Sequence, residues 1–200
     1  MGIMVGRYMA LRDKRLMGGV PAHHHLEIVN LNALISLRGA FAAINGYARR
    51  GRINALFILC HGYAGENIRL SVSADAGGMG LQLGKEGLMH NNVGLWGQIR
   101  GKVDSIIIYA CAAADTEPGN QYTDADGRYL MGSLALTTGA DVYAADRIQW
   151  YTTYNGLPNG AFDFGTWEGN LIMFSGSTGL DTIVPAPPVE LTDVLRGTAP

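Results

Sequence analysis

The sequence contains only two cysteines, Cys60 and Cys111, among its 200 residues. Two thiols cannot build a disulfide framework, and they cannot supply a structural zinc site by themselves, so folds stapled in either way are excluded. A single Cys60–Cys111 disulfide is possible if the protein is extracellular. The cysteine count therefore leaves the cellular compartment undetermined.

Long apolar runs and a strong excess of one charge are also lacking. No apolar stretch approaches the roughly 20 residues of a membrane helix, which predicts that the chain has no membrane span. The formal net charge of -2 gives no electrostatic reason to expect a nucleic-acid partner. Residues 1–19 carry their basic residues after the apolar ones, unlike a cleaved secretory signal. A cytoplasmic protein, export without a cleaved signal and a piece of a larger protein all stay open, as does the oligomeric state.

What the sequence does contain is the composition of an ordinary globular protein. Hydrophobic residues make up 48% of the chain and charged residues 16%, which supplies a core and argues against disorder. The length predicts a single domain, which we place at residues 1–184. The prolines of residues 185–200 predict an extended or flexible tail.

Apolar runs and helical periodicities alternate along the chain. Nearly continuous apolar runs predict strands buried on both faces of a parallel sheet, and apolar residues at helical spacing predict helices between them. The strands are predicted at residues 3–9, 53–60, 103–112 and 141–146, the helices at about 31–50, 92–101 and 127–140, and a loop at 11–25. Hairpins are predicted from residues 68–74 and 80–88, and at an antiparallel edge over 161–174 with its turn at 168–170. This alternation predicts an α/β fold, a three-layer α/β/α sandwich with a mostly parallel central sheet.

A histidine and a cysteine follow two of the predicted strands. His61 comes directly after the run at 53–60, and Cys111 closes the run that begins at Val103. All five histidines precede Cys111, which excludes the papain-type order, and no Gly-x-Ser-x-Gly follows His61, which excludes a lipase-like site. Cys111 lies 50 residues after His61, which matches the spacing of about 50 known for caspases.

The placement of these two residues suits nucleophilic catalysis. Carboxyl ends of parallel strands meet at one edge of a sheet, where α/β folds bind their ligands. An imidazole near a thiol can lower its pKa or take its proton. The N–H groups of Gly62 and Cys111 could form an oxyanion hole, because Gly62 has no side chain to block a substrate carbonyl. Cys60 is predicted to lie in the core, since neighbouring side chains of a strand point to opposite faces.

The blocks ILCHGYAG at 58–65 and IIIYACAAAD at 106–115 resemble the His-Gly and Ala-Cys blocks of the caspase-like (clan CD) cysteine peptidases. The ordered series of blocks over roughly residues 53–174 is similar to a bacterial domain of unknown function found in large secreted, adhesin-like proteins. The resemblance implies a caspase-like sandwich with His61 as catalytic histidine, Gly62 as oxyanion glycine and Cys111 as nucleophile. Tyr109 stands where metacaspases carry an aspartate, so the resemblance does not transfer a specificity.

Specificity is expected from the segment AADRIQWYTTY at 144–154, which follows the third apolar strand. Asp146 could bind a basic P1 side chain, and Arg147 an acidic one through a bidentate pair. Trp150 and Tyr151 could wall the pocket. A purely structural pair between Asp146 and Arg147 also stays open.

Other motifs carry simpler interpretations. Residues 23–25, three consecutive histidines, are expected to be solvated rather than to bind a metal, and TDADG at 123–127 to form an acidic turn rather than a calcium loop. The polar loop at 113–127 either shapes the active site or is a plain surface loop. We therefore predict a cysteine endopeptidase that acts on a protein or peptide, its own chain included, without a cofactor. The alternative is a catalytically inactive caspase-like module that serves binding or processing in a secreted or adhesin-like bacterial protein.

Overall fold

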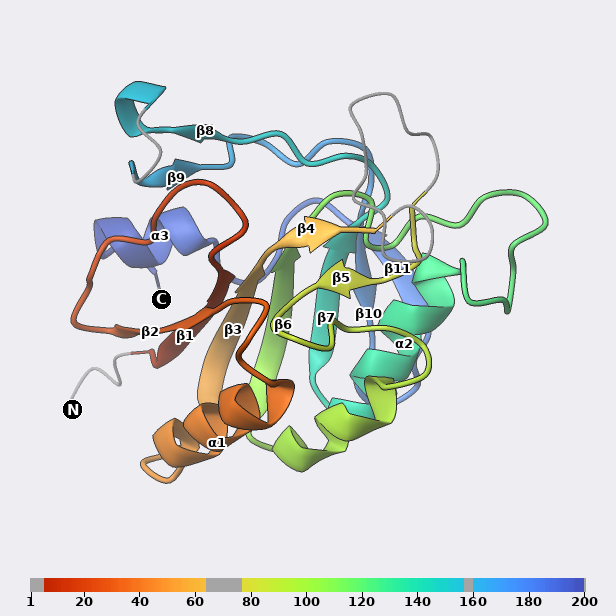
Figure 1. The fold of residues 1–200 in the computed structure, drawn as a ribbon, viewed down its shortest axis with the longest axis horizontal. Coiled ribbons are helices and arrows are strands. Elements are labelled where there is room, and N and C mark those ends of the chain that lie inside the picture. The colour runs from red at the N-terminus through yellow and green to blue at the C-terminus, as the bar shows by residue number, and fades with distance from the viewer. Residues whose placement is uncertain (1–5, 64–76, 157–159, 200) are drawn as a thin grey trace.

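Seven strands pair into one sheet in the order β11-β10-β7-β6-β3-β1-β2 (Figure 1). A computed structural model describes residues 6–63, 77–156 and 160–199 of the protein. The five strands from β2 to β7 in this order run parallel, and β10 and β11 are antiparallel to their neighbours. The strands are β1 (Tyr8–Asp13), β2 (Leu26–Leu31), β3 (Ile53–Leu59), β6 (Val103–Tyr109), β7 (Asp141–Ala145), β10 (Leu171–Phe174) and β11 (Asp181–Val184). The mostly parallel sheet is thereby confirmed.

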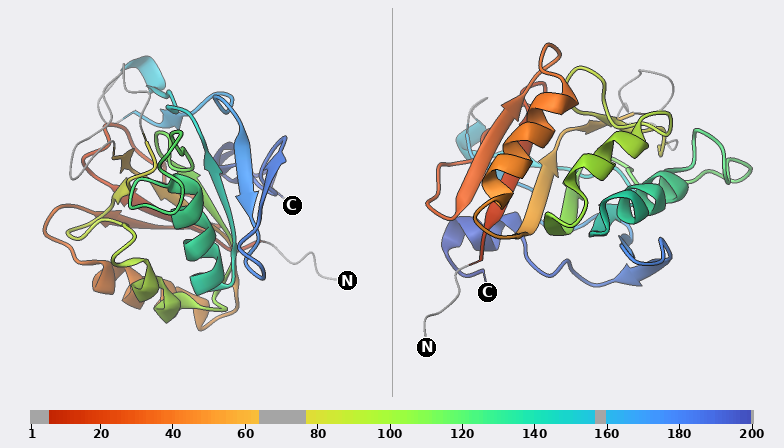
Figure 2. Two further views of the ribbon diagram at one scale, coloured as in Figure 1. Left: turned by 90° about the vertical axis from the view of Figure 1, so that its right-hand side faces the viewer. Right: turned by 90° about the horizontal axis from the view of Figure 1, so that it is seen from below.

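Helices flank this sheet on both faces (Figure 2). One face is covered by α1 (Leu37–Ala48), the 3-10 helix η1 (Val93–Ile99) and α2 (Gly127–Thr138), and the other by α3 (Leu191–Arg196). Smaller pieces complete the fold: β4 (His61–Gly62) pairs with β5 (Leu81–Gln82), β8 (Thr152–Thr153) pairs with β9 (Phe162–Asp163), and η2 spans Tyr154–Gly156. The α/β architecture is compatible with the predicted three-layer sandwich.

The central strands are buried on both faces, which is why their sequences are apolar without alternation. In β3, Leu56 and Ile58 pack into the core under α1 and α2, whereas Phe57 and Leu59 pack into the core on the side of α3. All four side chains are fully shielded from solvent. Residues 55–59 of β3 are therefore apolar at every position, whereas Asn54 near the start of the strand is exposed.

The helix α2 shows how local signals fix the ends of an element. Asp126 is its N-cap and accepts a hydrogen bond from the N–H of Tyr129 at 2.9 Å. Gly139 ends the helix in the left-handed conformation, with φ of 69°. The helix therefore starts and stops close to the range predicted from its periodicity.

The amino-terminal third differs from its sequence-based prediction. The first strand runs from Tyr8 to Asp13 and so extends into the predicted loop, and β2 lies in a segment for which no strand was predicted. The helix α1 begins at Leu37 because the chain first turns at residues 32–36, where the side chain of Asn32 accepts the N–H of Leu34 at 2.8 Å.

The predicted hairpin over 161–174 is wrong. Its first half, β9, pairs with β8 outside the main sheet, while β10 inserts antiparallel between β7 and β11. Of the other predicted hairpin, residues 68–74 lie outside the described residues. Gln82 and Leu81 pair with His61 and Gly62, respectively.

The carboxyl-terminal segment is not simply an extended tail. Residues 191–196 form α3, and Val189, Leu191 and Val194 are buried against the sheet. The carboxylate of Glu190 accepts hydrogen bonds from the hydroxyl of Tyr109 and, at 2.8 Å, from the indole N–H of Trp167. The predicted extended or flexible tail is therefore corrected to a segment that carries a packed helix.

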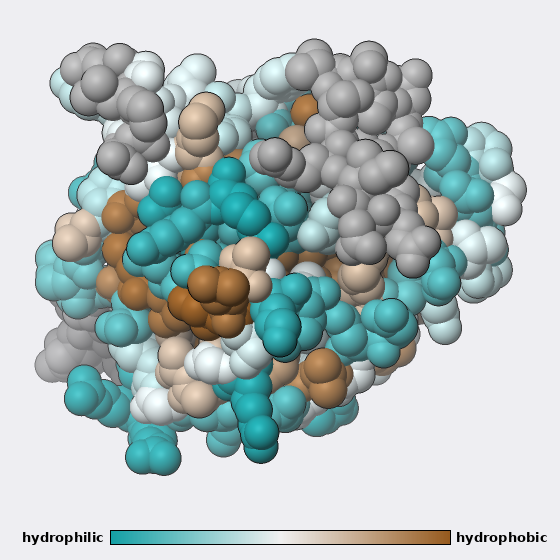
Figure 3. Space-filling model, in the orientation of Figure 1, coloured by the Kyte–Doolittle hydropathy of each residue, from teal (hydrophilic) through white to brown (hydrophobic). Residues whose placement is uncertain are grey.

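Within the described part of the chain, no helix has the length and apolar character that crossing a bilayer would require. The surface in Figure 3 is mostly hydrophilic, with small separate apolar patches. Exposed large apolar side chains occur both in connecting segments, such as Leu34 at 88% exposure, and on elements such as α2.

Candidate active site

His61 and Cys111 lie at the carboxyl ends of two neighbouring parallel strands. The register pairs Leu59 of β3 with Tyr109 of β6, and the N–H of Cys60 continues the ladder by donating to the carbonyl of Tyr109 at 3.3 Å. His61 and Cys111 each follow two residues after the last paired residues of these strands, and His61 already belongs to the separate β4–β5 pair. Backbones of paired strands lie about 4.7–4.9 Å apart. The fold thus brings the two predicted catalytic residues to the same edge of the sheet, just beyond the carboxyl ends of β3 and β6; Figure 1 shows these two strands side by side.

The backbone of Gly62 is oriented by the small β4–β5 pair. Leu81, which faces Gly62, uses its N–H and its carbonyl to bond Leu88, each at 2.9 Å. The next pair along, Tyr63 with Gly80, is hydrogen-bonded instead, through the N–H of Tyr63 at 2.8 Å. In an antiparallel ladder, hydrogen-bonded and non-hydrogen-bonded pairs alternate. Gly62 and Leu81 therefore form a non-hydrogen-bonded pair, and the N–H of Gly62 points away from β5. This orientation suits the predicted oxyanion role of Gly62.

The ring of His61 is oriented by a backbone carbonyl. Its Nε2 lies 3.2 Å from the carbonyl oxygen of Arg15. A carbonyl oxygen can only accept, so Nε2 carries the proton of the neutral ring in this contact and Nδ1 is its basic nitrogen. No sequence pattern indicates this contact, because Arg15 lies in a loop 46 residues before His61.

The loop that presents this carbonyl is anchored by a buried ion pair. The carboxylate of Asp13, which is fully shielded, accepts two hydrogen bonds from the guanidinium of Arg15 at 2.7 and 2.6 Å, and one from the N–H of Gly84 at 2.8 Å. Burial would raise the pKa of Asp13, but these hydrogen bonds outweigh it and lower the pKa. Asp13 therefore stays ionised and holds the turn that places Arg15 under His61.

The thiol of Cys111 is partly buried and protonated at rest. Its Sγ lies 3.7 Å from the carbonyl oxygen of Gln149, to which it donates. Burial raises the pKa of Cys111, a backbone hydrogen bond from Gln149 to the sulfur lowers it, and the Glu168 carboxylate raises it further. The net shift is upward, so the resting group at neutral pH is a thiol rather than a thiolate.

The residue after Cys111 adopts an uncommon backbone conformation. Ala112 has φ of 47°, in the left-handed region, and its N–H donates to the carbonyl of Arg147 at 2.8 Å. Its own carbonyl accepts the N–H of Gly78 at 3.0 Å. Such a turn directly after a strand sets Cys111 at a sharp bend, held by hydrogen bonds from two other segments.

Cys60 is confirmed as a core residue. It is 1% exposed and packs on the face of the sheet opposite Tyr109 and Leu59. Burial raises the pKa of Cys60 well above its usual value. Both cysteines are free thiols, so the structure contains no Cys60–Cys111 disulfide.

Three of the four predicted specificity residues line one pocket beside Cys111. This pocket has a volume of about 250 Å³, and we call it the acidic pocket. Asp146, Arg147 and Trp150 line it, and the other lining residues are Ala112, Asp115, Ile148, Glu168 and Gly169. Tyr151 is not among them; its ring packs edge-on against Phe162 with centroids 5.4 Å apart.

Gln149, which the sequence analysis did not single out, connects the pocket to Cys111. Its side-chain amide donates to the carbonyl of Glu168 at 2.9 Å and accepts the N–H of Glu168 at 3.3 Å. Its own carbonyl accepts the thiol of Cys111. Asp115 and Glu168, which also line the pocket, were likewise missed, because only the folded chain places them beside residues 146–150.

The remaining sequence motifs have structural roles. Asp126 of TDADG accepts hydrogen bonds from the N–H groups of Tyr122 and Tyr129 and from the hydroxyl of Thr116, so it caps α2 and orders the preceding loop. The rings of His23 and His24 lie with centroids 4.4 Å apart. Among the residues that the structure describes, no three His, Cys, Asp or Glu side chains are placed to hold a metal ion.

Compared with known proteins, the chain matches no family model and no curated protein. The site is therefore interpreted from its own geometry. That geometry consists of a histidine with a defined tautomer, a thiol at the next strand end, a glycine with an outward N–H, and an adjoining pocket.

Proposed function

We propose that this protein is a cysteine endopeptidase with a caspase-like fold, in which His61 and Cys111 form the catalytic dyad. The observation that carries the proposal is the register of β3 and β6, which brings the two residues to neighbouring strand ends. The order of the two residues and the resemblance of their blocks to clan CD peptidases support the same reaction. The substrate is a peptide bond of another protein or of this chain.

In the proposed acylation step, Cys111 Sγ attacks the carbonyl carbon of the scissile bond. His61 Nδ1 takes the thiol proton as the attack proceeds, which is required because the resting thiol is protonated. The N–H groups of Gly62 and Cys111 donate to the oxygen that becomes negative. His61 then gives its proton to the departing amine, which leaves a thioester on Cys111.

Hydrolysis of the thioester reverses these roles. A water molecule gives a proton to His61 and its oxygen attacks the acyl carbon, and the Cys111 sulfur departs and regains the proton. The Arg15 carbonyl keeps Nε2 protonated throughout and stabilises the imidazolium that forms. The reaction needs no group beyond the side chains and backbone of this chain and a water molecule.

The test is cleavage of a peptide library with varied P1 residues, followed by mass spectrometry. We expect the wild type to cleave and both Cys111→Ala and His61→Ala to lose activity by at least about 1,000-fold, as in other nucleophile–base pairs. Cys60→Ala, which removes the other thiol, is the matched control and should retain activity. Circular dichroism of each variant verifies that it is folded.

The binding or processing module remains the competing function. It would follow from a folded wild type that cleaves no library peptide, or whose cleavage persists unchanged in Cys111→Ala. Either result would remove the dyad as the basis of function.

A further inference from the structure

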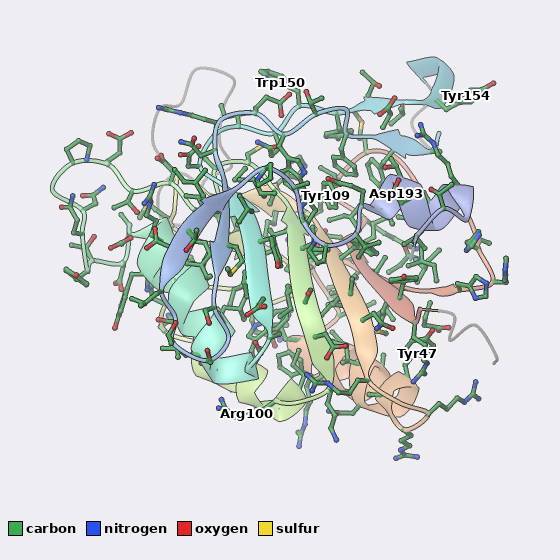
Figure 4. The ribbon with its side chains drawn as sticks, turned by 180° about the vertical axis from the view of Figure 1, so that it is seen from behind. Tyr47, Arg100, Tyr109, Trp150, Tyr154 and Asp193 are labelled. Atoms are coloured by element: carbon green, nitrogen blue, oxygen red, sulfur yellow. The ribbon has the colours of Figure 1, made fainter. Side chains whose placement is uncertain are left out.

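The acidic pocket adjoins the nucleophile of the proposed reaction. Ala112, the residue after Cys111, forms part of its wall, and Trp150 forms another part. In Figure 4, Trp150 lies at the same end of the molecule as Tyr109, where the parallel strands finish, and Arg100 lies at the opposite end. The volume of about 250 Å³ is below the roughly 300–1,000 Å³ of pockets for drug-sized ligands, so it suits a single side chain.

Carboxylates outnumber cations in this pocket. Asp115, Asp146 and Glu168 line it, against the single guanidinium of Arg147. All three carboxylates are partly buried, so their field is less screened than that of surface groups. The excess of negative charge favours a cationic occupant.

Two of the carboxylates are held in place by the fold. Asp146 accepts the backbone N–H of Asn170 at 2.8 Å and its side-chain amide at 2.9 Å. Glu168 is fixed through its backbone by Gln149, and its Oε2 accepts the N–H of Trp150 at 3.3 Å. Pre-positioned carboxylates bind a cation with little loss of side-chain freedom.

Arg147 is the one cationic residue among the described residues that line the pocket, and its charge lowers the pKa of Asp115, although burial and Glu117 raise that pKa overall. Arg147 is exposed, and its stem lies over Gly169, where an added Cβ would come within 2.3 Å of Arg147 Cγ. Solvent therefore screens its charge more than it screens the carboxylates. The opposite expectation, an acidic occupant paired with Arg147, is tested below.

The indole of Trp150 gives the pocket an aromatic wall. It is 52% exposed and lines the pocket next to Glu168. An aromatic face beside a carboxylate is a favourable site for a guanidinium or ammonium group, which can stack on the ring while its N–H groups reach the oxygens.

We propose that the acidic pocket binds the arginine or lysine side chain of the substrate residue whose carbonyl Cys111 attacks, with Glu168 and Asp115 as the recognising carboxylates and Trp150 as the stacking wall. This assignment rests on the proposed peptidase function and adds its specificity. Asp146, whose two oxygens already serve Asn170, contributes charge rather than a direct contact.

The first experiment compares matched fluorogenic peptides that carry arginine, its neutral analogue citrulline, or glutamate before the scissile bond. We expect kcat/KM for arginine to exceed that for citrulline by at least about 30-fold, since the charge-assisted contacts are lost in the neutral analogue. Glu168→Gln and Asp115→Asn should each lower the arginine preference by about 10-fold or more. Asp163→Asn, which removes an exposed carboxylate in β9 outside the pocket, should leave it unchanged. Equal rates for arginine and citrulline, or faster cleavage after glutamate, would overturn the assignment.

A second experiment separates the pocket from the peptidase reaction. Nα-acetyl-arginine amide and its citrulline counterpart are titrated into folded Cys111→Ala and followed by NMR, with resonances of Trp150 and Gly169 as reporters. Arginine-specific shifts that vanish in Cys111→Ala/Glu168→Gln support the pocket even if no peptide is ever cleaved. Cleavage by the wild type after non-basic residues, with no arginine-specific shifts, would refute the pocket and leave the peptidase standing.

Discussion

Replacing Asp13 by asparagine should destabilise the protein and misplace His61. Asparagine keeps the shape of the side chain but removes the charge that Arg15 pairs with, while the Gly84 N–H can still find an acceptor oxygen. Removing one partner of a buried ion pair costs roughly 3–5 kcal/mol. Arg15 retains 28% exposure, so water partly solvates the orphaned guanidinium. We therefore expect a loss near the lower end, about 3 kcal/mol.

The assay is guanidinium unfolding at pH 7 followed by circular dichroism. Asp104→Asn is the matched control, because Asp104 forms an ion pair with Arg52 in which both side chains are about half exposed. Such pairs contribute about 0–1 kcal/mol. If Asp13→Asn lost no more stability than Asp104→Asn, the buried pair would not hold the Arg15 turn in the way we infer.

The pH dependence gives an independent check of the same residue. The pKa of Asp13 is lowered in the folded state, so its stabilisation is complete above the unfolded value of about 3.9 and disappears as pH falls through the folded value. The stability difference between wild type and Asp13→Asn should therefore be constant above about pH 5 and shrink below about pH 4. A difference that grew on acidification would contradict the assigned charge state.

Three further predictions follow from other parts of the fold. Tyr109→Phe, which removes the hydroxyl donor to Glu190, should lower the free energy of unfolding by about 1.5–3 kcal/mol and increase hydrogen exchange in α3, with no such change in α2. Asp126→Ala, which removes the N-cap of α2, should cost about 1–2 kcal/mol in thermal unfolding, and an unchanged melting temperature would refute the capping role. Gly84→Ala should lower the melting temperature in the same assay, because φ of Gly84 is 63° and the added Cβ would lie 2.8 Å from the carbonyl oxygen of Ile35. Gly101→Ala is the control: φ of Gly101 is 71° but the space around it is open, so this variant measures the cost of the backbone conformation alone.

The elements that the sequence predicted well are those whose local pattern and tertiary environment agree. The strands β3, β6 and β7 carry continuous apolar runs because both of their faces are covered there, and α2 carries its own cap and stop residues. The ends of β3 and β6 then locate His61 and Cys111 at one edge of the sheet without any knowledge of the fold.

Other elements depend on distant contacts and could not be predicted in this way. The strand β2 has a partly exposed pattern and follows a polar, glycine-containing segment, so its pairing with β1 is what defines it. The helix α3 follows several prolines, and its burial depends on Tyr109, which lies 82 residues before Leu191.

The residues of the candidate site also separate into those that a local sequence pattern predicts and those that only the folded chain brings together. Asp146, Arg147 and Trp150 were predictable because they follow a strand that ends at the same edge as Cys111. Asp115, Gln149 and Glu168 were not, because no local pattern indicates that these three residues meet. The Arg15 carbonyl that orients His61 is a backbone group and leaves no signature in the sequence.

The most direct test of the central claim is covalent trapping of the dyad. The wild type, His61→Ala and Cys60→Ala are incubated with peptidyl acyloxymethyl ketones that carry arginine, norleucine or glutamate at P1, and the adducts are located by peptide mass mapping. We predict a single adduct on Cys111 in the wild type and in Cys60→Ala, formed at least about 100-fold more slowly in His61→Ala. No adduct on Cys111, or equal rates with and without His61, would contradict the proposal that these two residues form a catalytic pair.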